Sequence, residues 1–358
     1  DPTVYLDKKE ARKLDRYCQF ALIASDEAVK DSGITAENTN PDRVGVIFAS
    51  GIGGLITFQE EVINFASGDG TPRFNPFFIP KMIADICGGY ISMKYGYRGP
   101  NYTTVSACAS STNAVIDALM LIRLGKADVI ITGGSEAAVS PGGIGGFNSM
   151  HALSTRNDDY LTASRPFDKD RDGFVLGEGA ASLVLEEYEH AKARGAKIYA
   201  ELVGGGLSAD AYHLTAPHPD GLGARNVMLN ALEDAGLKPE DIDYVNVHGT
   251  STPLGDVAES KAIKEVFGEH AYQINISSTK SMTGHLLGAA GAAEAAVAVL
   301  SVYHDMVPPT INHFTDDPEL DAKLNFTFGT PQKRTVRAAL SNTFGFGGHN
   351  ASVIFKKI

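Results

Sequence analysis

The stretch SSTNAVIDALMLIRLGKADVIITGG (residues 110–134) places an amphipathic helix directly before a strand. Apolar residues recur at helical spacing until Gly125, which ends the helix. The run 128–134 is continuous and β-branched, which is typical of a strand buried on both faces, and RVGVIFAS (43–50) is a second such run. Strands that alternate with helices in this way predict an α/β fold with a mostly parallel sheet.

The same alternation continues along the chain and divides it near residue 200. We expect two similar α/β halves, 1–200 and 201–358, in a duplicated, layered architecture. Before residue 200, the pattern predicts one long amphipathic helix over 8–33 and loops over 139–150 and 154–174. After it, helices are predicted at 224–236, 255–268 and 286–303, and strands at 243–249, 273–278 and around 337–358.

Composition excludes several classes of protein. The chain of 358 residues has 43% hydrophobic and 21% charged residues, which is typical of soluble globular proteins. A net charge of −12 argues against bulk binding of nucleic acid. No apolar run approaches the roughly 18 residues of a membrane span, and no secretory leader opens the chain. Three cysteines without C-x-x-C spacing favour a reduced, cytosolic setting.

Cys108 is the first candidate for chemistry. It follows an extended run (101–105) and opens the helix, so the positive end of the helix dipole favours its thiolate. The same geometry offers backbone N–H groups to a developing oxyanion. An inert buried cysteine is an equally weighted alternative for Cys108 alone. Cys18 and Cys87 lie within helical patterns and fit that alternative better.

Two histidines strengthen the catalytic interpretation. His248 follows the predicted strand in DYVNVHGTSTPLGD, and His285 lies at a loop-to-helix junction in SSTKSMTGHLLGAAG. Parallel sheets carry their active sites at such strand ends. A zinc site made from Cys108 and the two histidines is a weaker alternative, because the close ligand pairs usual for zinc are missing.

Two further segments belong to the candidate site. Glu294 lies in a helix so apolar that an unpaired carboxylate would be costly to bury, so we expect it to pair with Lys280 rather than face solvent. SNTFGFGGHN (341–350) alternates glycine with Phe344 and Phe346. This pattern is typical of a closely approached loop, with a structural hairpin as the alternative.

The motifs VSACASS, VHGTSTPLGD, STKSMTGHLLGAAG and NTFGFGG together resemble the β-ketoacyl-acyl-carrier-protein synthases. The similarity is greatest to the long-chain elongating members of type II fatty-acid synthesis and runs from about residue 4 to the C-terminus. The segments ASRPFDKDRDGFVLGEGA and EEYEHAKARGAKIYAELVG fit the same family. The resemblance implies the thiolase fold, in which two similar halves form five αβαβα layers, and a homodimer with the site near the interface.

The resemblance also implies roles for individual residues. Cys108 would carry the acyl group, and His248 and His285 would stabilise the enolate formed when malonyl carrier protein loses carbon dioxide. No metal is implied, and no cofactor except the 4'-phosphopantetheine delivered on the carrier protein. The supporting roles are a charged pair (Lys280, Glu294), the oxyanion hole (Cys108, Phe346), the gate (Phe346), the phosphopantetheine site (Thr250, Thr252) and the acyl pocket (Ile52, Phe147, Phe344).

An acidic acyl carrier protein is the expected partner. On the predicted first helix, five basic residues share one face, and the acidic residues lie on the other. A solvated charged face is the simpler interpretation, but the family uses basic residues here for docking, and such a patch would steer and orient the carrier on an acidic enzyme. The five residues are Lys8, Lys9, Arg12, Lys13 and Arg16.

Three features depart from the family pattern. The family begins with a strand and a glycine-rich turn ahead of this chain, so we expect the sequence to be a truncated form of a longer protein. His349 stands where the family more often has a small hydroxyl residue, and His151 stands where a basic residue assists docking in relatives.

We expect a cytosolic, dimeric enzyme that elongates medium to long acyl chains by decarboxylative Claisen condensation. One rival is a thiolase-fold acyltransferase acting on coenzyme A thioesters, which the His248/His285 pair and the basic stripe disfavour. A second rival is an inactive partner subunit or truncated paralogue. Cys108 argues against it, because such subunits typically lack the cysteine.

Overall fold

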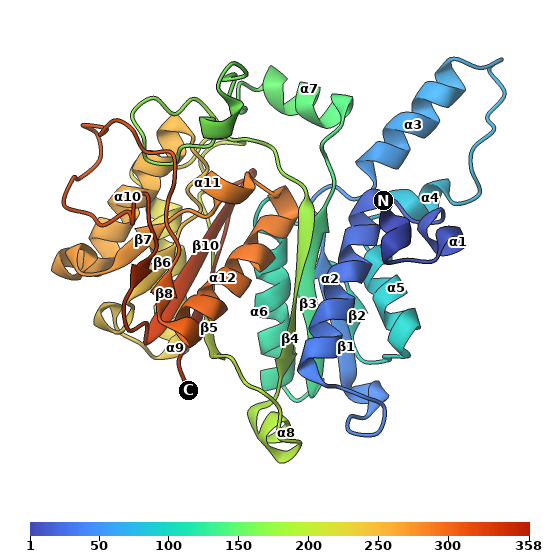
Figure 1. The fold of residues 1–358 in the computed structure, drawn as a ribbon, viewed down its shortest axis with the longest axis horizontal. Helices are drawn as coiled ribbons and strands as arrows, with labels where there is room; N and C mark the ends of the chain where they lie inside the picture. Colours follow the sequence, from blue (N-terminus) through green and yellow to red (C-terminus); the bar gives the residue numbers. More distant parts are fainter.

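The computed structural model describes all residues, Asp1–Ile358, and contains two main sheets (Figure 1). The first sheet has the order β2-β1-β3-β4. Its strands are parallel except β4, which runs antiparallel to β3. The bounds are β1 (Val44–Ala49), β2 (Asn101–Tyr102), β3 (Val129–Glu136) and β4 (Gly179–Glu186).

The second sheet comes from the part of the chain after residue 200 and has the order β5-β11-β10-β6-β7. Its core of β10, β6 and β7 is parallel, and β11 and β5 add antiparallel strands at one side. A short ribbon, β8 (Met306–Val307) with β9 (Gln332–Lys333), lies apart. The sheet strands are β5 (Glu201–Ala209), β6 (Tyr244–Asn246), β7 (Asn275–Ser277), β10 (Ala338–Gly345) and β11 (His349–Lys356).

Two helices form the layer between the sheets. α6 (Ser110–Arg123) and α12 (Ala290–His304) each contact strands of both sheets and pack against each other. α2 (Arg16–Ser32) and α5 (Ile86–Tyr95) cover the outer face of the first sheet. α9 (Leu222–Ala235) covers the second sheet, with α10 (Pro253–Phe267) packed against it. The expected five-layered αβαβα thiolase fold is therefore confirmed.

The remaining helices are short or lie at the periphery. The longest of them, α3, projects from the layered body in Figure 1, with α4 at its base. They are α1 (Lys8–Ala11), α3 (Leu55–Ala66), α4 (Phe78–Met82), α7 (Pro141–Ser149), α8 (Tyr188–Ala193) and α11 (Lys280–Thr283).

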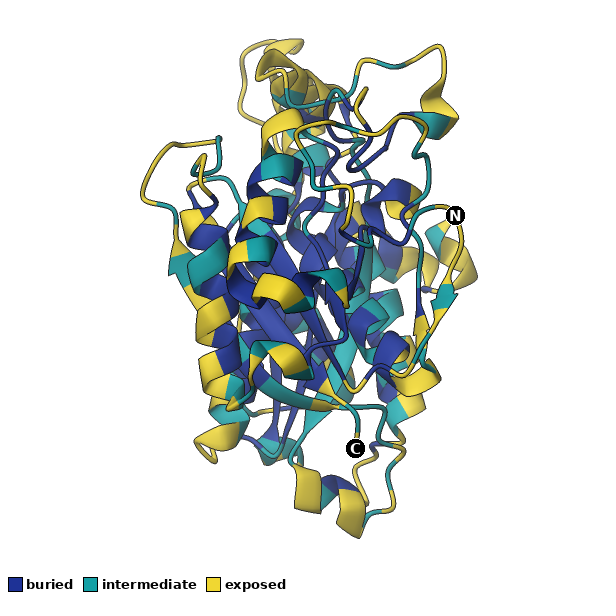
Figure 2. Ribbon diagram, turned by 90° about the vertical axis from the view of Figure 1, so that its left-hand side faces the viewer, coloured by how far each residue is buried: buried dark blue, intermediate teal, exposed yellow.

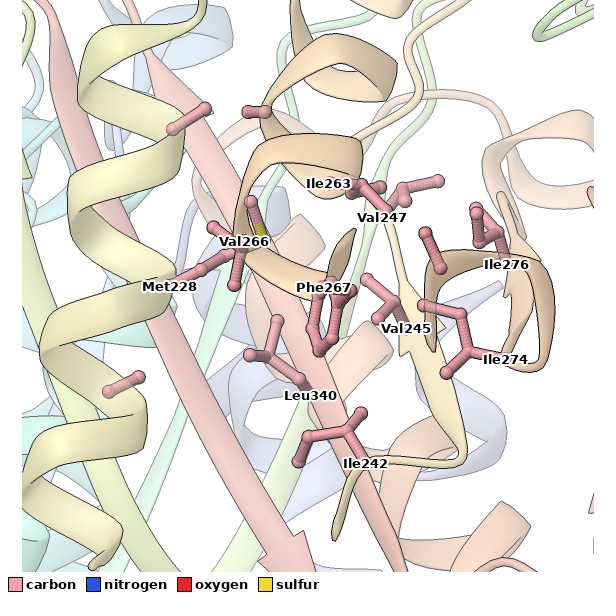
Figure 3. Packing of buried hydrophobic residues seen from close by; sticks show 14 of the residues in the cluster. Met228, Ile242, Val245, Val247, Ile263, Val266, Phe267, Ile274, Ile276 and Leu340 are labelled. Carbon is pink, nitrogen blue, oxygen red and sulfur yellow. The ribbon is translucent and has the colours of Figure 1, made fainter. Parts of the chain in front are cut away.

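Buried apolar side chains fill the spaces between the layers, so the sheets are the most buried part of the molecule (Figure 2). The largest cluster lies between α9, α10 and the second sheet (Figure 3). Met228 and Phe267 from the helices pack there against Val245 and Leu340 from the strands. Burial of such side chains stabilises the fold by about 1.5–3 kcal/mol each, which makes the sheets a rigid base for the loops at their ends.

The predicted first helix is wrong in one respect, because the chain breaks it into α1 and α2. Asp15 is 2% exposed and caps α2, since its carboxylate accepts from the N–H of Tyr17 at 3.2 Å. The other carboxylate oxygen accepts from the N–H of Thr57 at 3.0 Å and from its hydroxyl at 2.6 Å. A buried carboxylate with these partners is worth more at a helix start than in a helix interior. The five basic residues therefore do not share one helical face.

Two loop predictions are corrected. Residues 139–150 contain α7, because Ser140 accepts from the N–H of Gly143 at 3.1 Å and Pro141 occupies the first turn, where it needs no N–H partner. The segment 341–350 is part of a hairpin, which was the alternative: β10 and β11 pair up to Gly345 and His349, and residues 346–348 form the tip.

The expectation that no apolar run reaches the length of a membrane span is also corrected. The helical segment Leu287–His304 is long and apolar enough, but most of it is buried inside the molecule. It includes α12, which packs between the two sheets. Its composition is therefore explained by its place in the central layer.

Candidate active site

Cys108 lies in a tight turn at the start of α6. Ala107 has a φ of +51°, a conformation that a non-glycine residue adopts only under constraint. The constraint comes from Ser110, whose hydroxyl donates to the carbonyl of Ala107 at 2.6 Å and accepts from the N–H of Ser106 at 2.9 Å. The serine-rich sequence after the cysteine thus shapes the turn that presents the thiol.

The tip of the β10–β11 hairpin lies against this turn. A Cβ added at Gly345 would lie 2.7 Å from the carbonyl oxygen of Ser106 and 3.1 Å from the nitrogen of Cys108, so only glycine allows the approach. The next residue is Phe346, and the backbone N–H groups of Phe346 and Cys108 both favour the thiolate form of Cys108. These are the two residues predicted to form the oxyanion hole, and that role stays a prediction.

Both predicted histidines lie beside the thiol. His285 Nε2 is 3.0 Å from Cys108 Sγ, which is within hydrogen-bond distance for sulfur. The rings of His248 and His285 are nearly perpendicular, with centroids 5.3 Å apart. Residues 177 and 140 positions apart in the chain are therefore brought into one cluster, with the cysteine from the first half and the histidines from the second.

The backbone holds each histidine in place. The N–H of His285 donates to the carbonyl of Val175 at 2.8 Å, and the N–H of Gly177 donates back to the carbonyl of His285 at 3.0 Å. His248 follows β6, and its N–H donates to the buried carboxylate of Glu259 at 2.9 Å. The main chain at His285 is therefore fixed by other backbone groups, and the main chain at His248 is fixed by the Glu259 carboxylate.

Burial dominates the electrostatics of Cys108. It raises the pKa of the thiol to about 12, against the lowering effect of the Lys280 charge and of the two backbone N–H groups. The expectation that the helix start favours the thiolate is therefore outweighed in the resting site, because desolvation penalises the charged form more than the helix end stabilises it. The thiol needs a base at the moment of reaction, and His285 Nε2 is the nitrogen in reach.

Lys280 and Glu294 form the expected pair beneath the histidines. Lys280 is 1% exposed, and its Nζ donates to the carboxylate of Glu294. Burial raises the pKa of Glu294 to about 7, and the Lys280 charge opposes that shift. Burial, followed by the positive charge of Lys280, lowers the pKa values of His248 and His285 well below their usual range. Both histidines are consequently neutral near pH 7.

A cavity of about 370 Å³ opens over these groups. Phe147, Phe344 and Phe346 line it, in agreement with their predicted place at the pocket. Thr250 and Thr252 also line it, with their hydroxyl oxygens 3.0 Å apart. Ile52 is 41% exposed and does not line this cavity, so its assignment to the acyl pocket stays a prediction.

Several residues of the site were missed by the sequence analysis. Phe174 packs edge-on against His285 with centroids 5.2 Å apart, and Leu287 and Cys108 belong to the same buried cluster. Glu259 binds the backbone at His248, and the segment 215–218 lines the cavity. Of these residues, only Glu259 could have been found from the sequence. It lies one helical turn after Asp256 on the predicted helix that follows His248.

The basic residues predicted to dock a carrier lie on α1, on the turn after it and at the first residue of α2 instead of on one helix. Lys8, Lys9, Arg12, Lys13 and Arg16 are all exposed. Arg16 pairs with Glu178 at 2.6 Å, and Lys13 lies 5.9 Å over the ring of Phe77. His151 lines the cavity, whereas His349 is exposed at the start of β11. The structure therefore places His151, but none of the five basic residues, at the cavity.

The chain matches one family along most of its length. Residues 2–191 match "Beta-ketoacyl synthase, N-terminal domain", and residues 199–314 match "Beta-ketoacyl synthase, C-terminal domain". The chain is 52% identical over 357 residues to 3-oxoacyl-[acyl-carrier-protein] synthase 2 of Synechocystis sp., and it spans 85% of that relative. It is 50% identical over 354 residues to the protein of the same name from Staphylococcus aureus, strain N315, of which it spans 84%.

Solved structures agree with these matches. A type II PKS ketosynthase, determined with its acyl-carrier protein and bound to the hexaketide, superposes with a TM-score of 0.92 and 35% identity. The superposition covers 96% of this chain and 85% of the other. A beta-ketoacyl synthase from Burkholderia phymatum gives 0.90 and 39% identity, with 98% and 84% covered. The chain therefore belongs to the β-ketoacyl synthase family, as the resemblance of its motifs predicted.

Proposed function

We propose that this chain elongates acyl groups by decarboxylative condensation of a Cys108-bound acyl thioester with malonyl carrier protein. The relatives at 50–52% identity carry the name 3-oxoacyl-acyl-carrier-protein synthase, so the chain is an acyltransferase of fatty-acid synthesis. One observation carries the mechanism: His285 Nε2 lies 3.0 Å from Cys108 Sγ in a cavity that also holds His248. A buried thiol beside two neutral histidines suits thioester exchange without a metal.

The first half-reaction loads the enzyme. His285 Nε2 accepts the thiol proton as Cys108 Sγ attacks the carbonyl carbon of the acyl thioester. The N–H groups of Cys108 and Phe346 hold the negative oxygen of the tetrahedral intermediate. The carbon–sulfur bond to the carrier then breaks, the departing thiolate takes the proton, and the acyl group remains on Cys108 as a thioester.

The second half-reaction forms the carbon–carbon bond. The malonyl thioester loses carbon dioxide, and the electron pair of the broken bond becomes an enolate whose oxygen needs hydrogen-bond donors. His248 and His285 are neutral, so each can donate one ring N–H to that oxygen; His285 does so in the tautomer that carries its proton on Nε2, whereas the other tautomer accepts the thiol proton. The enolate carbon attacks the acyl carbonyl, and the Cys108 thiolate leaves. Burial, and after it the positive charge of Lys280, keeps both rings in the neutral, donating form.

The cavity walls divide into polar and apolar parts that fit the two ends of the substrate. Thr250 and Thr252 offer hydroxyl groups to the amides of the phosphopantetheine arm. Phe147 and Phe344 offer an apolar wall to an acyl chain of medium to long length. Phe346 lies on the hairpin tip between the glycines, where rotation of its ring would admit the acyl chain. No cofactor of the chain's own takes part in this scheme.

An acyl carrier protein is the proposed partner, since a ketosynthase of the same fold has been determined with one. Lys8, Lys9, Arg12 and Lys13 have no acidic partner, so their charges are available to acidic carrier residues. Steering by such residues depends on ionic strength.

A homodimer is proposed because α3 and its connection to α4 expose many large apolar side chains. Exposed apolar surface of this extent marks interfaces between proteins. The exposed side chains are Phe58, Val62, Ile63, Phe65, Phe74, Phe77 and Ile79.

A cytoplasmic setting is proposed because all three cysteines are free.

The test is to incubate the chain with a long-chain acyl carrier protein and to record its intact mass. We expect one added acyl group on the parent chain and none on Cys108→Ala. Malonyl carrier protein should then release a product two carbons longer. A folded parent chain that gains no acyl mass would refute the proposed function.

A further inference from the structure

A further buried carboxylate of the site, Glu136, has no role in the scheme above. It is the last residue of β3 and is 0% exposed. No lysine, arginine or histidine lies within salt-bridge distance of it. A carboxylate buried without a cation must be stabilised by hydrogen bonds alone.

Four donors surround the two oxygens of Glu136. Oε1 accepts from the hydroxyl of Ser50 at 3.0 Å and from the N–H of Ile52 at 3.1 Å. Oε2 accepts from the N–H of Gly51 at 2.8 Å and from the N–H of Gly288 at 3.0 Å. Burial raises the pKa of Glu136, and the four hydrogen bonds oppose that shift, because an ionised carboxylate accepts about four hydrogen bonds and a protonated one fewer.

The donors come from two segments that meet beside the turn carrying the nucleophile. Residues 50–52 follow β1, and a Cβ added at Gly51 would lie 3.3 Å from the carbonyl oxygen of Ala107, next to Cys108. Gly288 follows Leu287, which has a φ of +49° and is packed in the buried cluster that contains Cys108. The carboxylate thus bonds to the loop under the nucleophile and to the turn after His285.

The close approach is built into the backbone on both sides. A Cβ at Gly51 or at Gly288 would lie 2.7 Å from Glu136 Oε2, and a Cβ at Gly288 would lie 2.3 Å from the nitrogen of Gly51. Real Cβ atoms do not approach so closely, so both positions require glycine. Gly51, Gly288 and Glu136 therefore form one closely packed unit.

The second half of the chain contains the same device at His248. There the carboxylate of Glu259 accepts from the consecutive N–H groups of His248 and Gly249, both at 2.9 Å. In the first half, Glu136 accepts from the consecutive N–H groups of Gly51 and Ile52. Both pairs directly follow the central parallel strand of their sheet.

We propose that Glu136 is a positioning residue for the condensation, whose carboxylate holds the loop 50–52 and the turn at Gly288 in fixed register around Cys108. This inference rests on the proposed function, because the register matters through the distance between Cys108 and His285. The negative charge of Glu136 also acts on the thiol, since it raises the pKa of Cys108. The other groups that face the thiol are Lys280, whose charge lowers that pKa, and the neutral His248 and His285.

The test compares Glu136→Gln with the parent chain in two assays. The first is single-turnover acylation of Cys108 by a long-chain acyl carrier protein, followed by intact mass. The second is the rate of alkylation by iodoacetamide as a function of pH. We expect acylation to slow by about tenfold or more, because a misplaced base loses near-attack geometry. The alkylation profile should move to lower pH, because a negative charge beside the thiol is gone.

The matched control is Asp168→Asn. Asp168 is also 0% exposed and accepts backbone N–H bonds, from Phe314 at 2.6 Å and Thr315 at 2.8 Å, but it lies outside the cavity. This variant should lose stability and keep the alkylation profile. An unchanged acylation rate in Glu136→Gln overturns the proposal. A slower rate with an unshifted alkylation profile also overturns it, since general destabilisation would then explain the loss.

Two provisions keep the test decisive. If Glu136→Gln does not fold, Ser50→Ala removes one of the four donors and should slow acylation by about two- to tenfold; no change would overturn the proposal. If the parent chain is not acylated at all, the proposed function fails. The iodoacetamide profiles still report whether Glu136 acts on the thiol.

Discussion

The two halves of the molecule repeat one plan with different contents. In the first, β1 pairs in parallel with β2 and β3, and β3 pairs antiparallel with β4. In the second, β6 pairs in parallel with β7 and β10, and β10 pairs antiparallel with β11. The central helices α6 and α12 follow β2 and β7 in the chain, so they occupy equivalent places.

The difference lies in what each half places at equivalent points. Cys108 precedes α6, and His285 precedes α12, so the two residues that touch across the site occupy corresponding positions. After the central parallel strand, the second half carries His248, whereas the first half carries the loop with Ile52. A duplicated scaffold therefore brings its two helix starts together, with the proposed nucleophile at one and the proposed base at the other.

The largest expected effect separates the proposed role of Cys108 from the proposed roles of the two histidines. Cys108→Ala should lose the acyl adduct but keep the decarboxylation of malonyl carrier protein, because both histidines that stabilise the enolate come from the other half. Intact mass of enzyme and carrier checks both statements. Cys87→Ala removes a cysteine that is also buried, in α5, and should behave as the parent chain. An adduct on Cys108→Ala would place the nucleophile elsewhere.

The two histidines of the second half should differ from each other. His285→Ala should slow acylation of Cys108 by about 10²-fold or more, because it removes the only ring nitrogen in contact with the thiol. His248→Ala should slow acylation by less than about tenfold and still abolish condensation. Single-turnover mass measurements with and without malonyl carrier protein separate the steps. The reverse order of effects would exchange the proposed roles.

The fold and the chemical residues were predictable because each depends on short-range patterns. The run 128–134 predicted a strand buried on both faces, and every residue of β3 is buried. Strand ends followed by polar turns identified His248 and His285, since a parallel sheet gathers such ends at one edge. Cys108 alone was equally consistent with an inert buried cysteine, and the two histidines decided in favour of the catalytic interpretation.

What was missed depends on contacts between distant residues. The break at Asp15 arises because Thr57, 42 positions away, offers its carboxylate two hydrogen bonds. The role of Glu136 depends on Gly288, 152 positions away, and nothing in TGGSE signals it. The pKa of Cys108 was misjudged for the same reason, because helix position is local but burial results from the whole fold.

A smaller effect compares an interior strand of the second sheet with an edge strand of the first. β11 lies between β10 and β5, and six of its eight residues are buried; β4 has a strand on one side only, and all eight of its residues are half-buried. Val353→Ala in β11 should therefore lower the free energy of unfolding by about 2 kcal/mol, and Val184→Ala in β4 by about half of that or less. Urea denaturation of both variants measures the difference. Equal losses would show that the edge of β4 is covered in solution.

The last effect is the pH dependence of stability that the two buried histidines cause. Their pKa values are lowered in the folded chain, so below pH 6.5 the unfolded chain takes up protons that the folded chain does not. Their contribution to stability is therefore complete above pH 6.5 and is lost as the pH falls, by up to about 1.4 kcal/mol per pH unit for each ring. Glu259 and Glu294 act in the opposite sense, since burial raises their pKa values to about 7 and the folded chain holds their protons more tightly.

The stability of the parent chain alone would mix these two contributions, so the comparison must remove one of them. In His248→Gln/His285→Gln the two buried rings of the second half are removed, and the contribution of the buried carboxyl groups remains. We expect the parent chain to lose more unfolding free energy than this variant between pH 6.5 and pH 5, as measured by urea denaturation at each pH. Parallel curves would mean that the rings take up protons as readily in the folded chain as in the unfolded chain, and below pH 6.5 a protonated His285 could not accept the proton of Cys108.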